Sequence, residues 1–225
     1  MLLPPPCVSV RTVPGRTLGP LHHGLRVRDH AFIAGTGSDQ TIAIASADDG
    51  RIIRRLQGCK GKYVTSLAAS PDGKDLYYAT EGSIWAIPAA DGTPRKVSAG
   101  DGVAVDPNGK EVIINLLDTG GARLVRIPLS GSPEQIINVQ DGIRIDPLPL
   151  GGNGLRKDGK LLIGVSPRDS WFFSPAVLDV ASGELTRIPL NYTGDILLSG
   201  WASDGPILAY GEPMRAHIWR FRPMH

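Results

Sequence analysis

The sequence predicts an all-β protein of the β-propeller class, with about five four-stranded antiparallel blades. Three observations support this prediction: two series of glycine turns alternate along the chain, short segments rich in β-branched and aromatic residues lie between them, and no segment keeps a helical period over three turns. The chain has 225 residues, of which 28 are glycine and 19 are proline, so it contains the turn formers that many short strands require.

The first series of turns joins an Asp or Asn to a glycine, and three of its four members continue with lysine. Both dipeptides tolerate the positive φ that tight hairpins require, so we expect these residues to have a structural role in a repeated turn. The four copies are Asp72-Gly73, Asn108-Gly109, Asp158-Gly159 and Asp204-Gly205, at glycine intervals of 36, 50 and 46 residues.

The second series of turns falls between the members of the first. Its dipeptides are Asp49-Gly50, Asp91-Gly92, Ser130-Gly131 and Ser182-Gly183, at glycine intervals of 42, 39 and 52 residues. Both series scatter about the period of ~40–45 residues that is typical of four-stranded propeller blades.

The segments between the turns alternate in polarity and favour β-branched or aromatic residues, as short strands do. We count five units, four of them interpreted as full blades and the last as three-stranded, although only three strands are identified in the first and fourth. The predicted strands are 31–34, 41–46 and 51–56; then 63–69, 76–80, 84–88 and 95–98; then 103–105, 111–115, 124–128 and 135–139; then 161–165, 176–180 and 184–188; and finally 196–201, 207–210 and 217–221.

The turn sequences resemble the TolB-like, PD40-type (WD40-like) propeller repeat, whose signature is a Ser-Pro-Asp-Gly-Lys turn between the first two strands of a blade. Residues 70–74 match the signature in full, residues 106–110 match it nearly, and residues 156–160 and 202–206 are degenerate copies. The resemblance covers about residues 25–223. It implies the propeller architecture and says little about function, because one fold hosts many tasks.

The expected domain division is a short segment 1–24 followed by a propeller domain 25–225. TolB-like propellers commonly have six blades, and a propeller usually closes with a strand from its other terminus. Two interpretations of the first segment stay open. Residues 7–13 alternate suitably for a closing strand, or residues 1–24 form an irregular leader on a truncated propeller, which is the interpretation we prefer.

A narrower resemblance lies in the C-terminal third. Residues 169–179 and 218–223 are similar to propeller regions of large bacterial proteins, where the propeller follows a serine/threonine kinase or a winged-helix DNA-binding domain. The chain contains neither a Gly-rich phosphate loop nor a His-Arg-Asp segment, so no kinase activity is carried over. The resemblance implies the sensing or docking part of a bacterial signalling protein.

Bulk properties bound the function further. The net charge of +2 predicts no nucleic-acid binding, and no apolar stretch reaches the ~18 residues that direct membrane insertion needs. The first residues lack the features of a signal peptide, so the chain is expected to stay in the cytoplasm unless an upstream anchor exports it. We expect free thiols at Cys7 and Cys59, and a monomer unless an open propeller edge pairs.

No motif in the sequence predicts a catalytic residue, a metal site or a cofactor. Adjacent residues His22 and His23 point to opposite sides of an extended segment and chelate poorly, and Asp48 and Asp49 suit a hairpin turn. Gly164 to Arg168 is not a nucleophile elbow, and Gly35 to Ser38 precedes no helix that would bind phosphate.

The main departure from the repeat is an insertion at residues 166–175 between two strands of the fourth unit. Its candidate contact residues for a partner are Arg168, Asp169, Trp171, Phe172 and Phe173, because exposed aromatics beside an arginine suit a protein or peptide contact. The alternative is that the three aromatics cover the core. A second excursion, residues 147–154, is expected to lengthen a loop of the same unit.

The sequence thus favours a non-catalytic binding or scaffold module with a protein or peptide partner. The competing hypothesis is a propeller enzyme resembling a lactone hydrolase or a lyase. Such enzymes collect acids and histidines from several strands around a divalent cation in the central channel, and a dispersed site of this kind leaves no spacing signature in the sequence.

Overall fold

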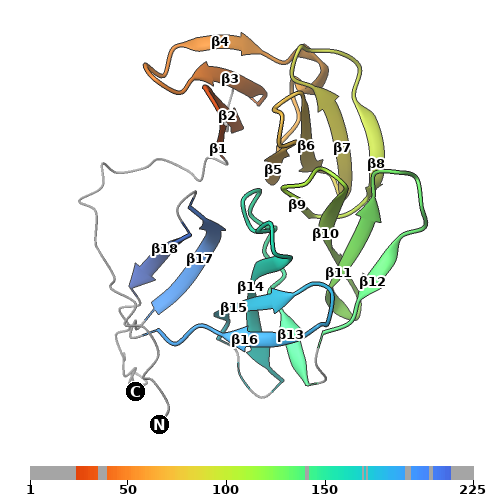
Figure 1. The fold of residues 1–225 in the computed structure, drawn as a ribbon, viewed down its shortest axis with the longest axis vertical. Helices are drawn as coiled ribbons and strands as arrows, with labels where there is room; N and C mark the ends of the chain where they lie inside the picture. Colours follow the sequence, from red (N-terminus) through yellow and green to blue (C-terminus); the bar gives the residue numbers. More distant parts are fainter. Residues whose placement is uncertain are drawn as a thin grey trace, which may run out of the picture.

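The computed structural model describes residues 24–34, 40–139, 142–168, 170, 172–190, 194–202 and 205–213. Their regular secondary structure consists of strands, apart from one 3-10 turn, η1 (Gln57–Cys59). Successive antiparallel sheets follow one another around a common centre (Figure 1). The predicted all-β class and its repeated units are therefore confirmed.

The first two sheets each have four strands paired in chain order, and we name them blade 1 and blade 2. Blade 1 contains β1 (Gly24–Val27), β2 (His30–Ala34), β3 (Ile42–Ser46) and β4 (Ile52–Arg55); blade 2 contains β5 (Ser66–Ala69), β6 (Asp75–Thr80), β7 (Ser83–Pro88) and β8 (Arg95–Ala99).

The next two sheets are joined. Blade 3 contains β9 (Gly102–Val105), β10 (Glu111–Asp118), β11 (Gly121–Pro128) and β12 (Gln135–Ile137); blade 4 contains β13 (Ile143–Ile145), β14 (Lys160–Pro167), β15 (Ser174–Asp179) and β16 (Leu185–Arg187). The joint is a single pair, Ala122 with Ile145, so β12 and β13 share one edge of β11.

The last unit is a two-stranded sheet in the described residues. It contains β17 (Gly194–Trp201) and β18 (Ile207–Pro213), which extends three residues beyond the predicted strand. The predicted third strand, 217–221, and the candidate closing strand, 7–13, both lie outside the described residues.

Two strands were missing from the sequence prediction. β1 supplies the first strand of blade 1, and β13 supplies the first strand of blade 4. The insertion predicted at 166–175 is also shorter than expected, because β14 continues to Pro167 and β15 already begins at Ser174.

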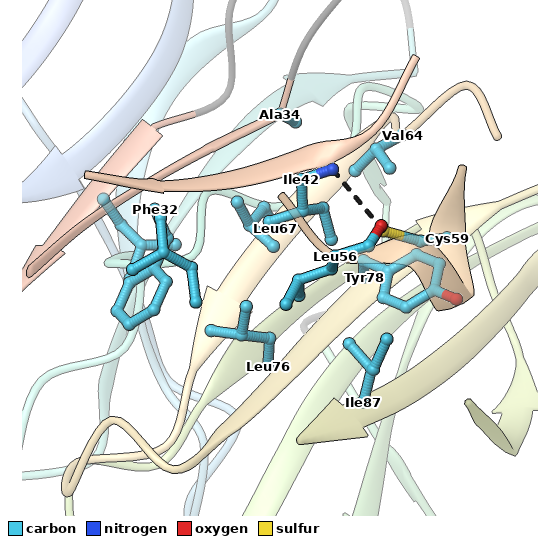
Figure 2. Packing of buried hydrophobic residues seen from close by; sticks show 12 residues of the cluster. Phe32, Ala34, Ile42, Leu56, Cys59, Val64, Leu67, Leu76, Tyr78 and Ile87 are labelled. Carbon is cyan, nitrogen blue, oxygen red and sulfur yellow. Dashed lines mark hydrogen bonds between the residues drawn. The ribbon is translucent and has the colours of Figure 1, made fainter. Parts of the chain in front are cut away.

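The hydrophobic core lies between neighbouring blades. Along β6 the side chains alternate: Leu76 and Tyr78 pack toward blade 1, whereas Tyr77 and Ala79 pack toward blade 3. Figure 2 shows the cluster between blades 1 and 2. In this cluster Phe32, Ile42 and Leu56 pack with Leu76 and Tyr78 of blade 2. Both faces of a middle strand are buried, which explains why such strands are nearly continuous apolar runs.

The first series of turns shares one backbone pattern. In each turn the glycine N–H donates to the carbonyl three residues earlier, as Gly73 does to Ser70 at 2.8 Å. Gly73, Gly109, Gly159 and Gly205 all have φ between +71° and +97°, a region that favours glycine. In the two matching copies the closing pair spans six residues, 70–75 and 106–111, whereas the degenerate copies at 156–160 and 202–206 span five.

Candidate functional site

The expected loop at residues 147–154, which we name the central segment, interrupts the first strand of blade 4. Ile145 pairs with Val165 in β14, but the next bridge joins Leu155 to Leu161. A continuous strand would place residue 149 opposite Leu161, so the central segment adds six residues. In Figure 1 the teal chain between β13 and β14 extends into the middle of the ring, toward β5 and β9.

Two buried polar side chains hold the central segment against blades 2 and 3. The Ser66 Oγ donates to the Leu150 carbonyl at 2.8 Å. The Asn115 amide donates to the Leu148 carbonyl and accepts from the Leu150 N–H, both at 3.2 Å. The segment therefore does more than lengthen a loop of blade 4, which corrects the sequence expectation.

Large apolar side chains are exposed in this segment, on β10 and just before β5. Tyr63 is 56% exposed, Leu117 49% and Leu148 41%. Hydrogen bonds link their surroundings: the Thr65 Oγ1 donates to the Asp101 carbonyl at 3.2 Å, and the Asp101 carboxylate accepts from the Leu117 N–H at 2.8 Å. Asn115 then connects β10 to the Leu148 carbonyl. We name Tyr63, Leu117 and Leu148 the apolar strip.

The predicted contact residues divide between surface and interior. Phe172 is 62% exposed and Arg168 is exposed, whereas Phe173 is half-buried beneath the Arg144 guanidinium, 5.6 Å from its ring centroid. Phe172 is thus free of the core and Phe173 is partly covered, and the partner contact expected for these residues stays a prediction. Asp169 and Trp171 lie outside the described residues.

Two pockets are present in the described residues, and the first of them adjoins Leu148 and Phe173. One has a cavity volume of about 40 Å³ and is lined in part by Asp146, Leu148, Phe173 and Ile196. The other, between blades 3 and 4, has a volume of about 200 Å³ and is lined in part by Arg126. Sites for small organic ligands usually measure roughly 300–1,000 Å³, so these pockets suit water, ions or single inserted side chains better than a substrate.

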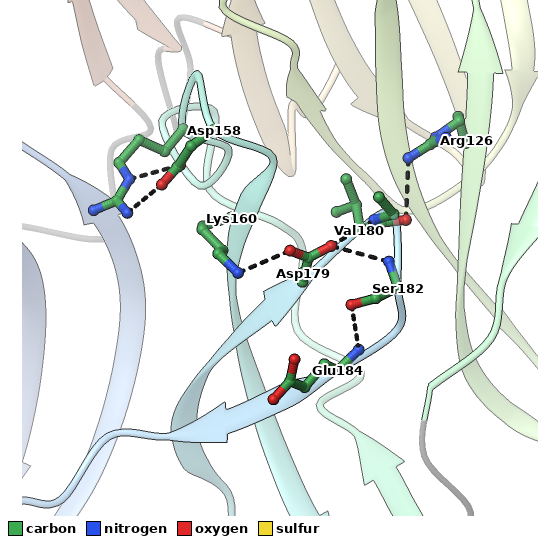
Figure 3. A network of polar contacts seen from close by, with 9 residues as sticks. Arg126, Asp158, Lys160, Asp179, Val180, Ser182 and Glu184 are labelled. Carbon is green, nitrogen blue, oxygen red and sulfur yellow. Dashed lines mark hydrogen bonds and ion pairs between the residues drawn. The ribbon is translucent and has the colours of Figure 1, made fainter.

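The charged groups of blade 4 stabilise turns and blade contacts (Figure 3). Asp179 accepts from the Lys160 Nζ at 2.8 Å and from the Ser182 and Ala181 N–H groups, and these bonds hold its pKa well below the usual range. Arg126 of blade 3 donates to the Val180 carbonyl at 3.0 Å, which joins the two blades.

The other turn carboxylates are likewise bound to their own turns. The Asp72 carboxylate accepts from Ser70 Oγ at 2.7 Å and from the Lys74 N–H at 3.1 Å, which lowers its pKa. Asp158 pairs with Arg156, and that bond lowers its pKa. In blade 3 the Asn108 side-chain amide donates to the Asp106 carboxylate at the equivalent turn. Asp204 lies outside the described residues.

Within the described ranges, no group of three or more His, Cys, Asp or Glu residues is arranged to hold a metal ion. In the same part of the chain, no helix is long and apolar enough to span a membrane. His22, His23 and the segment Gly35 to Ser38 lie outside the described residues.

Cys59 is a buried free thiol that accepts from the Ile42 N–H, and burial raises its pKa (Figure 2).

The sequence analysis did not identify the two residues that hold the central segment, although their polarity was a signal. Ser66 and Asn115 are polar residues within apolar strands, and both are fully buried. A buried polar side chain requires a hydrogen-bond partner, so such an exception predicts a contact that the repeat itself does not supply. The partner lies 84 residues away for Ser66, which no local pattern reveals.

Comparison with known proteins shows the fold of this chain. No family model and no curated protein matches the chain. Among solved structures, a TolB protein from Agrobacterium tumefaciens has 21% identity and a TM-score of 0.53, over 69% of this chain and 54% of that one.

Two further structures have higher TM-scores. Hydrazine synthase from Kuenenia stuttgartiensis gives 0.61 at 16% identity, over 88% of this chain and 58% of that one. The β-propeller domain of Cps50 (Swd1) from Myceliophteria thermophila has a TM-score of 0.58 at 17% identity, over 89% of this chain and 65% of that one. The chain thus spans 54% to 65% of these three proteins. It has a β-propeller fold of the TolB-like and WD40-like kind.

Proposed function

We propose that this protein is a non-catalytic binding module whose partner is another protein. The observation that supports this most directly is the apolar strip, in which Tyr63, Leu117 and Leu148 are exposed in one hydrogen-bonded region of the fold. Burying large apolar and aromatic side chains provides much of the affinity of protein interfaces, and tyrosine is enriched among the residues that dominate binding.

Charged pairs stand near the apolar strip. Lys62 pairs with Glu81 at 2.9 Å, and Arg123 pairs with Asp118 at 3.1 Å. All four side chains are more than 40% exposed, so the pairs are solvated. An apolar centre with a solvated polar rim is the usual composition of a protein interface.

The loop 168–173 extends the proposed surface into blade 4. Its Phe173 lines the same small pocket as Leu148, and its Phe172 presents an uncovered ring beside it. Arg168 contributes a charged group that can bind a carboxylate of a partner. Asp169 and Trp171 belong to the same proposed contact.

The test is a comparison of captured partners. A triple variant, Tyr63→Ala, Leu117→Ala and Phe172→Ala, removes exposed side chains only and is expected to keep the unfolding temperature. Ile136→Ala is the matched control, because Ile136 is 58% exposed on β12 and lies outside the strip. We expect wild type and the control to bind the same purified partner, and the triple variant to bind it at least 10-fold more weakly.

If the triple variant binds that partner as tightly as wild type does, the proposal that this surface makes the contact is refuted. A divalent-cation screen addresses the competing class of function. Stabilisation by calcium, magnesium or manganese, together with turnover of a lactone or a similar small substrate, would favour a channel enzyme over a binding module.

We also propose that the propeller domain, residues 25–225, acts as the sensing or docking part of a larger bacterial signalling protein. The support is the resemblance of the C-terminal third to kinase-linked and winged-helix-linked propellers. The coding region immediately upstream provides the test. A kinase or DNA-binding domain in the same reading frame is expected, and an unrelated upstream gene would contradict this part of the proposal.

A further inference from the structure

The central segment contacts units on both of its sides. Besides its bonds to Ser66 and Asn115, it accepts bonds from β17: the Trp201 N–H donates to the Asn153 carbonyl at 2.9 Å, and the Trp201 indole N–H donates to the Gly154 carbonyl at 3.0 Å. The Arg156 guanidinium lies over the Trp201 ring at 4.4 Å. One short stretch of chain thus bonds to blades 2 and 3 and to the last unit.

Two glycines show how closely the central segment fits. A Cβ on Gly152 would overlap the Leu67 carbonyl of blade 2, and a Cβ on Gly102 of blade 3 would overlap the Leu150 backbone nitrogen. Two backbone segments can approach this closely only where one of them has a glycine, which carries no Cβ. The segment therefore fits against β5 and β9 and does not simply fill the space between the units.

Ser66 joins three units through one hydroxyl. Its oxygen accepts from the Val103 N–H of blade 3 at 3.0 Å, while its proton goes to the Leu150 carbonyl at 2.8 Å. Within the described residues, no strand pair connects the sheet of blade 1 with the β17–β18 sheet. Blade 2 and the β17–β18 unit are therefore connected in two ways, through the successive contacts of blades 2, 3 and 4 with β17 and directly through the bonds of the central segment.

We propose that the central segment is a clasp that couples the stability of blade 2 to that of the β17–β18 unit across the middle of the propeller. If the clasp operates, weakening its bond at one end must loosen the structure at the other end. Coupling of this kind is reciprocal, so each end reports on the other.

Hydrogen exchange measured peptide by peptide tests this coupling. Ser66→Ala removes the bond from the blade 2 side, and Trp201→Phe removes the indole donor from the other side while keeping a ring beneath Arg156. We expect Ser66→Ala to accelerate exchange in β17, and Trp201→Phe to accelerate exchange in β5. The loss of one buried hydrogen bond corresponds to about 5–30-fold.

Thr41→Val is the matched control. The Thr41 hydroxyl is buried like that of Ser66, and it donates to the Leu56 carbonyl at 2.8 Å within blade 1. This variant is expected to accelerate exchange in β3 and β4 and to leave β17 unchanged.

Two results would overturn the clasp. In the first, Ser66→Ala accelerates β5 alone and Trp201→Phe accelerates β17 alone, so that no coupling crosses the centre. In the second, Thr41→Val accelerates β17 as much as Ser66→Ala does, which would mean that the effect reports global stability. If Ser66→Ala does not fold, Trp201→Phe decides alone through exchange in β5.

Discussion

Replacing Asn115 with alanine should destabilise the protein far more than replacing an exposed asparagine. Asn115 is fully buried and binds the central segment through two hydrogen bonds, one to the Leu150 N–H and one to the Leu148 carbonyl. Leu150 is only 6% exposed, so its N–H has no access to water after the substitution. Leu148 is 41% exposed, and its carbonyl can find a water molecule instead.

The two losses therefore differ in size. An unsatisfied buried N–H costs about 1–3 kcal/mol, and the bond to the more accessible carbonyl contributes about 0.5–1.5 kcal/mol. We expect a total of about 3 kcal/mol, which lowers the unfolding temperature of a domain of this size by roughly 6–12 °C.

Thermal unfolding followed by circular dichroism measures this difference. Asn108→Ala is the control, because Asn108 is exposed in a turn and its side-chain amide donates to Asp106 of the same turn. It should lower the unfolding temperature by about 1–4 °C, as a change of about 0.5–1 kcal/mol does. Equal shifts for the two variants would show that the central segment is not held by Asn115, and the geometry described above would be wrong.

Two further predictions concern single residues of the turns and strands. Gly183→Ala should destabilise the protein by more than Gly131→Ala: both positions have positive φ, but only at Gly183 would a Cβ overlap a carbonyl, that of Asn138, whereas Gly131 faces open space. In urea unfolding, the free energy of unfolding is expected to fall by about 1 kcal/mol for Gly131→Ala and by clearly more for Gly183→Ala. The reverse order would contradict the contact between Gly183 of blade 4 and Asn138 of blade 3. The second prediction concerns Glu111, whose pKa is raised because burial outweighs the attraction of Arg126 at 3.2 Å. A raised pKa means that the folded state holds this proton more tightly, so the stability contributed by Glu111 is present below its unfolded pKa of about 4.5 and is lost as the pH rises through the folded pKa. Urea unfolding between pH 4 and 7 should show this loss in wild type and not in Glu111→Gln, and parallel pH profiles would refute it.

The repeated parts of the fold could be predicted from the sequence because their causes are local. The glycine of each first-series turn needs a positive φ, and the strands between turns need alternating apolar residues, both of which are visible within a few positions. β6 shows this clearly, since Leu76 and Tyr77 face different neighbouring blades.

The parts that could not be predicted depend on distant residues. β13 has three residues and is followed at once by the central segment, so no two-residue period is long enough to reveal it. The fit between Leu150 and Ser66 depends on the arrangement of whole blades. The apolar strip was missed for the same reason, because the bonds that link its surroundings join Thr65 and Leu117 to Asp101, which is 36 and 16 residues away from them.

The interrupted first strand of blade 4 has a consequence for how the chain is made. Ser66 and Asn115 leave the ribosome before Leu150 does, by 84 and 35 residues respectively. Until Leu150 is available, β5 and β9 are edge strands without the central segment against them. A nascent chain that stalls before residue 147 presents those open strand edges to other chains, which is a recognised route to aggregation. The bonds that blades 2 and 3 make to Leu148 and Leu150 can therefore form only after residue 150 has been synthesised.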